Sequence, residues 1–170
     1  RSRVACNRPG RAVFFYNDVP AGVARNSFSE AESGTVSVLV YRDRPLFGQI
    51  RRLIDTAVRP HFPQCDPVRV QLAELPPGCV IAPHADRNLL TMMHRLHVPL
   101  VTDENVRFII DRQTYLLKAG RLYDLNNVRV HAVENSGRIN RIHLLIDMLP
   151  RAVAQVRYFE ALEDMVDALH

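Results

Sequence analysis

The chain has 170 residues, of which 47% are hydrophobic, and this is enough for one domain with a core of its own. Its 22 basic and 18 acidic residues give a net charge of +4, but they are dispersed and form no long basic run or base-reading motif, which argues against nucleic acid as a partner. No apolar stretch approaches the roughly 20 residues that a membrane span requires.

The cysteines and the first residue bear on the cellular setting. Cys6, Cys65 and Cys79 show no CxxC spacing, and their odd number argues against a disulfide framework. We therefore expect a reducing, cytoplasmic location. The chain begins at Arg1 without a charged-then-apolar leader, and we expect it to be an excised or processed piece.

Apolar residues are spaced as on one helix face near each end of the chain. Residues 45–58 follow this spacing, and Pro60 and Pro63 end it. Residues 152–169 return to the same spacing, so a C-terminal helix is predicted at about 151–169.

Between these helices, short apolar stretches are separated by turn residues. The clearest turns are Pro76-Pro77-Gly78 and Asn135-Ser136-Gly137. Many antiparallel strands at this spacing indicate a barrel or sandwich with its core at about 66–149, so residues 1–170 are predicted to form a single, mainly β domain with a helix on either side. The predicted strands are 68–75, 95–100, 106–110, 115–117, 121–125, 130–133 and 139–148.

His84 and Asp86 are candidate metal ligands. They are two residues apart, and in a strand residues i and i+2 project from the same face, so that one ion can contact both. Two histidines and one carboxylate on one face of an octahedral ion leave three positions open, which is the arrangement of non-haem iron oxygenases. An HxD pair alone is common by chance, so a second histidine is needed. His131 on a predicted strand is the candidate, and its alternative role is that of a satisfied core histidine.

Three basic residues on predicted strands indicate an anionic ligand. Arg141 lies in a strand so apolar that its guanidinium requires an anion, and a dicarboxylic cosubstrate supplies one through a two-pronged hydrogen bond. Arg95 and His97 share one strand face and can donate to a second carboxylate. The alternative is an internal salt bridge, for example to Asp124 or Asp147.

The order of several separate motifs resembles the aspartyl/asparaginyl β-hydroxylase family of 2-oxoglutarate oxygenases. Together they extend over nearly half of the chain, and their common order makes the match far more specific than HxD alone. The motifs are Leu75-Pro76-Pro77-Gly78, His84, Arg95-Leu96-His97-Val98-Pro99-Leu100, Gly120, Leu125-Asn126-Asn127, His131-Ala132-Val133-Glu134-Asn135 and Arg141-Ile142-His143-Leu144-Leu145-Ile146-Asp147.

The resemblance implies a fold and a set of roles. The implied fold is a double-stranded β-helix, a cupin-like jelly roll, with iron in its mouth. His84 and His131 would be metal ligands, Arg141 would bind the distal carboxylate of 2-oxoglutarate, and Arg95 with His97 would lie near its metal-bound end.

Two positions depart from the founding animal enzymes of that family. Those enzymes have a glycine in place of Asp86, whereas bacterial relatives that hydroxylate free proline or lipopolysaccharide sugar resemble this chain in keeping HxD. Ala73 stands where the animal enzymes have a cosubstrate-contacting serine, so the distal carboxylate would depend more on Arg141.

From the resemblance we expect an enzyme, an iron(II)- and 2-oxoglutarate-dependent dioxygenase that uses O2 to hydroxylate an unactivated carbon of an Asp- or Asn-type residue in a protein or peptide. A hydroxylase of a free amino acid or other small molecule stays open as an alternative, as does a non-oxygenase, cupin-type metal-binding domain. The candidate substrate contacts are Arg87, Asn127 and Arg129, each of which could instead be a turn or rim residue. The sequence does not decide the oligomeric state.

Overall fold

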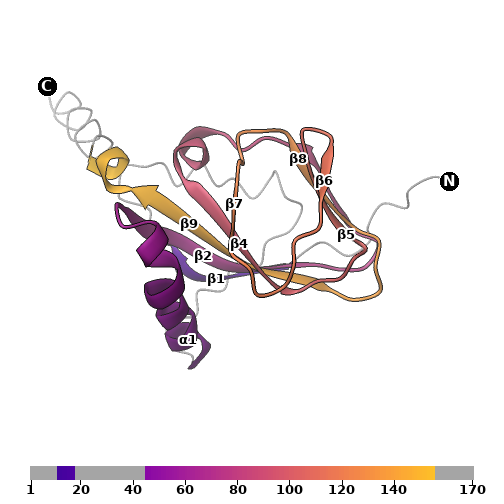
Figure 1. Ribbon diagram of the computed structural model, residues 1–170, viewed down its shortest axis with the longest axis horizontal. Coiled ribbons are helices and arrows are strands. Elements are labelled where there is room, and N and C mark those ends of the chain that lie inside the picture. The colour runs from indigo at the N-terminus through magenta and orange to yellow at the C-terminus, as the bar shows by residue number, and fades with distance from the viewer. Residues whose placement is uncertain (1–10, 18–44, 156–170) are drawn as a thin grey trace, which may run out of the picture.

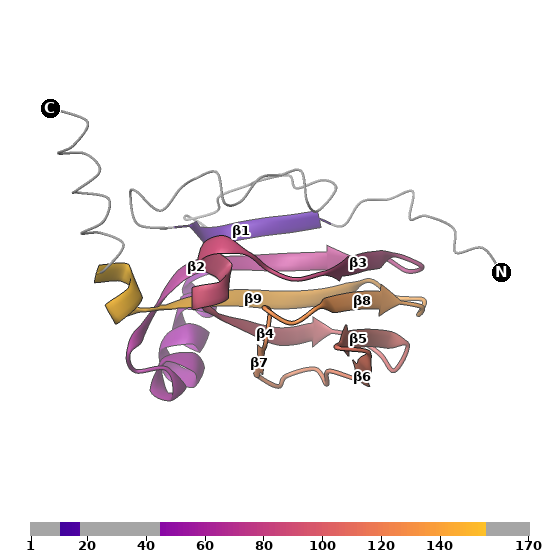
Figure 2. The same cartoon turned by 90° about the horizontal axis from the view of Figure 1, so that it is seen from above.

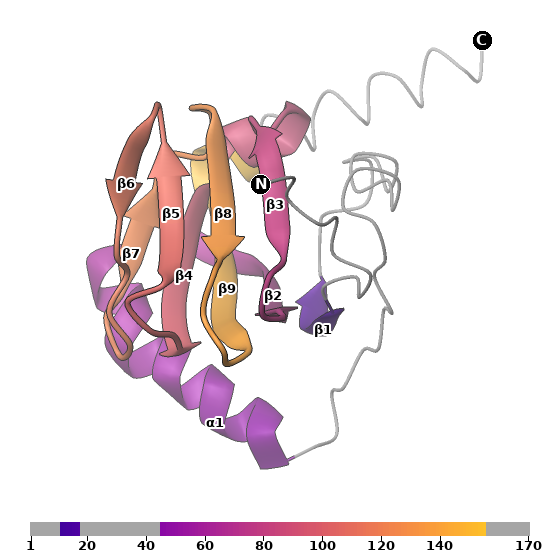
Figure 3. The ribbon, with the colours of Figure 1, turned by 90° about the vertical axis from the view of Figure 1, so that its right-hand side faces the viewer.

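The computed structural model describes residues 11–17 and 45–155, and within these ranges the chain forms nine strands in two antiparallel sheets that face each other (Figures 1 and 3). The larger sheet has the order β1-β2-β9-β4-β7 and the smaller has the order β3-β8-β5-β6. The strands are β1 (Arg11–Asn17), β2 (Cys65–Leu75), β3 (Val80–His84), β4 (His94–Val101), β5 (Val106–Ile110), β6 (Gln113–Tyr115), β7 (Tyr123–Leu125), β8 (His131–Asn135) and β9 (Arg141–Pro150).

The pairing of the strands defines a jelly roll. β2 pairs with β9, β3 with β8, β4 with β7 and β5 with β6. The chain therefore forms one long antiparallel ribbon that ends in the β5–β6 hairpin. The ribbon is folded so that successive strand pairs belong alternately to the larger and the smaller sheet (Figure 2). The expectation of a mainly β, double-stranded β-helix fold is confirmed.

A helix covers the outer face of the larger sheet. Helix α1 (Pro45–Leu53) continues through a π-helical turn, Ile54–Val58, and ends in a short 3-10 turn that contains Pro60. The predicted helix at 45–58 is thus confirmed. Its apolar face packs on the larger sheet, on the side away from the smaller sheet (Figure 1). The buried residues of this cluster are Ile50, Ile54, Val58, Cys65, Val70, Leu96, Val98, Leu144, Ile146 and Met148.

Alternation along β9 separates this outer core from the inside of the barrel. Leu144, Ile146 and Met148 belong to the cluster under the helix, whereas Arg141 and His143 are buried on the opposite face, between the sheets. The predicted alternation of this strand is therefore confirmed.

Several predicted elements needed correction. The strand predicted at 115–117 is β6, two residues earlier, because Asp111 and Arg112 both have positive φ and make the hairpin turn before Gln113. The prediction contained neither β1 nor β3, and four of the five residues of β3 are exposed, which hides the apolar signal of a strand. Only residues 151–155 of the predicted C-terminal helix are described, and they are helical; residues 156–169 lie outside the described ranges.

Two of the cysteines are described. Cys65 is a buried free thiol, whereas Cys79 is disulfide-bonded. Disulfides are rare in reducing compartments, so the bond of Cys79 does not support the location that the odd cysteine count suggested. Within residues 11–17 and 45–155, no helix is long and apolar enough to cross a membrane.

Candidate metal centre and cosubstrate pocket

His84 and His131 face each other across the pairing of β3 with β8. They are register partners, and their ring centroids are 4.2 Å apart. In each ring Nδ1 is bonded to the backbone carbonyl two residues earlier, at 2.8 Å from Ala82 O and 2.9 Å from Arg129 O. A carbonyl can only accept, so Nδ1 carries the proton and Nε2 keeps its lone pair, which is how metal-binding histidines are oriented in proteins.

Asp86 lies in the loop after β3, so the argument that it projects from the same strand face as His84 is wrong. The loop is held by a hydrogen bond from Asp86 N to Asn127 O (2.9 Å). Its carboxylate is held through one oxygen, because Oδ2 accepts bonds from Arg95 Nη1 (2.7 Å) and Asn127 Nδ2 (3.0 Å). The other oxygen, Oδ1, is 3.9 Å from His84 Nε2 and remains for an ion.

The three side chains fit a metal ion. One potential ligand atom from each of His84, Asp86 and His131 lies within 4.8 Å of the others, so small side-chain rotations bring all three onto one ion. Burial lowers the pKa of His131, which favours the neutral imidazole that a ligand must be. Two imidazoles and one carboxylate suit a divalent transition metal.

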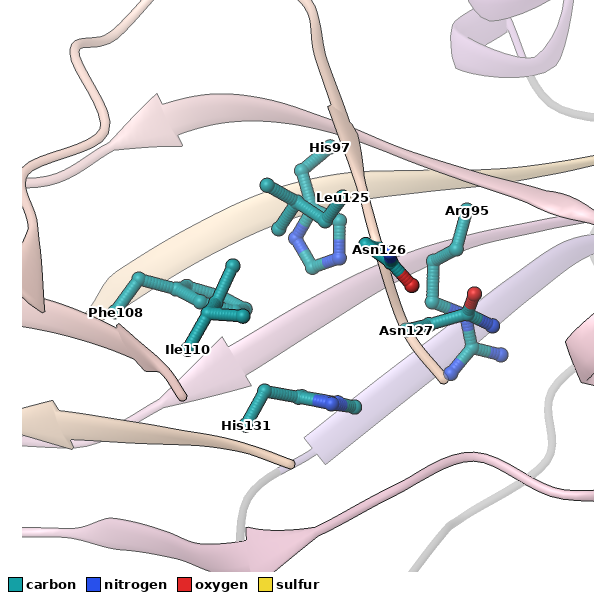
Figure 4. A pocket seen from close by; sticks show the side chains of 8 residues that line it. All are labelled: Arg95, His97, Phe108, Ile110, Leu125, Asn126, Asn127 and His131. Atoms are coloured by element: carbon teal, nitrogen blue, oxygen red, sulfur yellow. The ribbon is translucent and has the colours of Figure 1, made fainter. Parts of the chain in front are cut away.

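A small pocket opens beside these ligands (Figure 4). Its empty space is about 200 Å³, which includes space open to solvent. Figure 4 shows Arg95, Asn126 and Asn127 on one side of it and Phe108 and Ile110 on the other. The lining residues are Arg95, His97, Phe108, Ile110, Leu125, Asn126, Asn127 and His131.

A chain of basic side chains leads inward from this pocket to Arg141. His97 Nδ1 is 3.3 Å from His143 Nδ1. His143 Nδ1 also accepts a hydrogen bond from Arg141 Nη2 at 2.7 Å. His143 Nε2 therefore carries the proton of that ring. Within the described part of the chain, this Nε2 and Arg141 Nε are both buried without a hydrogen-bond partner.

Arg141 is consequently a buried cation that has no anionic partner among residues 11–17 and 45–155. Only 2% of its surface is exposed, and burial lowers its pKa to about 9. The pKa of His143 is lowered to about 2, first by burial and then by the charge of Arg141, so this ring is neutral. A carboxylate would supply the opposite charge that Arg141 lacks among the described residues.

The sequence around this site matches a known protein family. A model of the family described as aspartyl/asparaginyl beta-hydroxylase matches residues 40–150, which is more than half of the chain. The chain belongs to the aspartyl/asparaginyl beta-hydroxylase family. The predicted resemblance is thereby confirmed.

Solved structures with similar folds are cupins or related barrels. A predicted oxalate decarboxylase from Thermotoga maritima is 18% identical, over 54% of this chain and 72% of that chain, with a TM-score of 0.40. A Cupin 2 conserved barrel domain protein from Salinispora arenicola is 12% identical, over 54% and 71%, with a TM-score of 0.41. A cupin domain from Bordetella pertussis is 19% identical, over 49% and 92%, with a TM-score of 0.39. No curated protein matches the chain.

Within this family member, Arg95 lies at the pocket but is engaged by carboxylates of the protein. It bonds Asp147 through Nε (2.9 Å) and Nη2 (3.3 Å), and Asp86 through Nη1. The internal salt bridge considered as an alternative is therefore present, with Asp147; Asp124 instead bonds His94. The guanidinium retains further N–H groups, so a role of Arg95 toward a cosubstrate stays a prediction.

The three candidate substrate contacts lie in different surroundings. Asn127 is buried, and its amide nitrogen donates to Asp86 Oδ2 and to Leu90 O (2.7 Å), so it helps to hold the Asp86 carboxylate. Arg87 is exposed, and Arg129 is exposed and pairs with Asp111 at 3.2 Å. Rim contacts thus remain a prediction for Arg87 and Arg129.

Proposed function

We propose that this protein is an iron(II)- and 2-oxoglutarate-dependent dioxygenase that hydroxylates an unactivated carbon of an Asp- or Asn-type residue in a peptide or protein. The observation that carries the proposal is the pairing of two features. Three candidate ligand side chains lie together, one of them at the pocket. The inward chain from His97 ends at a buried guanidinium that has no anion in the described part of the chain. A cupin that only binds metal requires the first feature but not the second.

His84, Asp86 and His131 would hold the iron. When bound, iron(II) with 2-oxoglutarate and dioxygen supplies the oxidant that replaces a C–H hydrogen by hydroxyl, with succinate and carbon dioxide as co-products. The carbonyls of Ala82 and Arg129 orient the two imidazoles, and they thereby fix Nε2 as the ligand atom before any ion arrives.

Arg141 and His143 would bind the distal carboxylate of the cosubstrate. Their unpaired N–H groups are donors, and the guanidinium supplies the opposite charge. Phe108, Ile110 and Leu125 form the apolar wall of the pocket and would keep water from the reacting atoms.

An uncoupled turnover assay tests the proposal. Full-length protein with iron(II), ascorbate and labelled 2-oxoglutarate should release labelled carbon dioxide, and His131→Ala should abolish the release. His61→Ala is the matched control, because His61 is exposed in the turn after α1 and should keep full activity. If the wild type released none with any substrate pool and instead bound zinc tightly, a cupin-type metal domain would replace this proposal.

The substrate is tested separately. Incubation of the active protein with lysate peptides and with free amino acids, followed by mass spectrometry, should show a gain of one oxygen atom on peptides. A gain confined to free amino acids would assign the protein to small-molecule hydroxylation.

A further inference from the structure

Three charged side chains form a row across the inner face of the larger sheet. Asp147 on β9 is the register partner of Arg69 on β2 and of Arg95 on β4. These strands are neighbours in the order β2-β9-β4, so the sheet backbone itself fixes the spacing of the row. Asp147 is only 2% exposed, and both arginine side chains are largely buried.

Hydrogen bonds connect the row to the metal site. Arg69 Nε donates to Asp147 Oδ2 at 2.5 Å, and Arg95 holds the same carboxylate with Nε and Nη2. This two-pronged contact leaves Arg95 Nη1 directed at Asp86 Oδ2. Charges alternate from Arg69 to Asp86, so each inner member has an opposite charge on both sides.

Asp86 depends on this support because of where it lies. It follows the end of β3, so no strand pairing fixes its side chain. The bonds from Arg95 and Asn127 occupy Oδ2 and leave Oδ1 on the side of the histidines. The carboxylate is therefore presented to an ion through one oxygen.

We propose that Asp147 is a positioning residue for the metal site, which acts through Arg95 to hold Asp86 as a one-oxygen ligand. This inference rests on the proposed metal-binding function. If the charge of Asp147 is removed, Arg95 loses one of its two anions and is free to cover both oxygens of Asp86, where it competes with the ion. Loss of such an outer support typically lowers metal affinity by about 10–100-fold.

Titration with Ni(II) tests the proposal. This ion is chosen because imidazole and carboxylate sites bind it more tightly than iron(II). Asp147→Asn keeps the size of the side chain and should weaken Ni(II) binding by about 10–100-fold in isothermal titration calorimetry. Asp66→Asn is the matched control, because Asp66 also pairs with two arginines, Arg59 and Arg151, but is 49% exposed and lies outside the row. The control should bind Ni(II) like the wild type.

A double variant separates positioning from a general structural effect. If Asp147 acts through Asp86, Asp147→Asn should add little to the loss caused by Asp86→Ala, whereas a general weakening of the fold would add in full. Should Asp147→Asn fail to fold, Arg95→Lys serves instead, because its single ammonium keeps the charge but cannot reproduce the fork that holds both carboxylates.

The outcomes are distinct. Ni(II) affinity of a folded Asp147→Asn or Arg95→Lys within twofold of the wild type would overturn the inference and leave the proposed function standing. Additive losses in the double variant would also overturn it. A wild type that binds no Ni(II) would overturn both.

Discussion

Arg141 brings a positive charge into the barrel without an acidic partner among the described residues. Burying an unpaired charge costs several kcal/mol, and the lowered pKa of this guanidinium, about 9, has the same physical cause. A side chain of this kind weakens the folded state and is expected where a ligand carries the opposite charge.

Arg141→Met should therefore stabilise the protein in the absence of ligand. Methionine fills a similar length without the charge, and we expect the free energy of unfolding in urea to rise by about 1–4 kcal/mol. In contrast, adding 2-oxoglutarate to the metal-loaded protein should raise the melting temperature of the wild type by more than that of the variant. A variant markedly less stable than the wild type would mean that another group in the protein already balances the charge of Arg141.

The lowered pKa of His143 predicts that the stability of the protein falls in mildly acidic solution. In the folded protein this histidine is neutral with a pKa of about 2, whereas an unfolded chain takes up a proton below about 6.5. Because the unfolded state then binds more protons, stability should fall as the pH drops below 6.5, by about 2 kcal/mol at pH 5 from this residue.

Urea unfolding of His143→Leu at pH 7 and pH 5 measures this contribution. The variant should lose about 2 kcal/mol less than the wild type between the two pH values. Burial also lowers the pKa of His97. His97 therefore contributes to the pH dependence in the same direction in both proteins, and its contribution cancels in the comparison. Equal losses would show that His143 takes up its proton in the folded state.

At the residue scale, the sequence allowed some of the site to be predicted. His84 and His131 could be identified because residue type and motif order carry the signal, and Arg141 because a cation in an apolar strand is conspicuous. The contact of Asn127 with Asp86 could not, since it joins side chains that meet only after the sheets form. The salt bridge between Arg95 and Asp147, 52 residues apart, was considered only as an alternative.

At the scale of elements, the turn between β8 and β9 depends on Asn135. Its side chain is buried, donates to Leu75 O (2.8 Å) and Ile139 O (2.9 Å), and accepts from Gly137 N (3.1 Å). One amide therefore ties the end of β2 to the β8–β9 connection.

Asn135→Ala should destabilise the protein by about 2–4 kcal/mol, because it leaves backbone groups without partners in a buried position. Ser136→Ala, at the exposed neighbouring position, should stay within about 0.5 kcal/mol of the wild type. Urea unfolding of the two variants checks the difference, and a loss in Asn135→Ala no greater than in Ser136→Ala would refute the role of this amide.

Strand positions were predicted best where one face is buried. β5 was predicted at its observed bounds, because buried Val106 and Phe108 stand on either side of the exposed Arg107. β3 was not predicted, although it carries His84, because it lies at the edge of the smaller sheet and is mostly exposed. Asp86 was thus proposed as a ligand by an incorrect structural argument, although its carboxylate lies near His84 and His131.

At the scale of the whole molecule, the jelly roll explains how distant residues form one site. Pairing of β3 with β8 brings His84 to His131, and the β2-β9-β4 order aligns Arg69, Asp147 and Arg95. The apolar core under the helix packs on the outer face of the larger sheet. A second apolar cluster, with residues from both sheets, shares the barrel interior with the polar side chains.

In the proposed function, one ligand joins the metal site to Arg141. Equilibrium dialysis of labelled 2-oxoglutarate against Ni(II)-loaded protein without substrate is the decisive measurement. The wild type should bind one equivalent only when metal is present, and Arg141→Met should weaken binding at least about 30-fold, as expected when one partner of a buried charge pair is removed. Binding that is independent of metal, or equally tight in Arg141→Met, would contradict the claim.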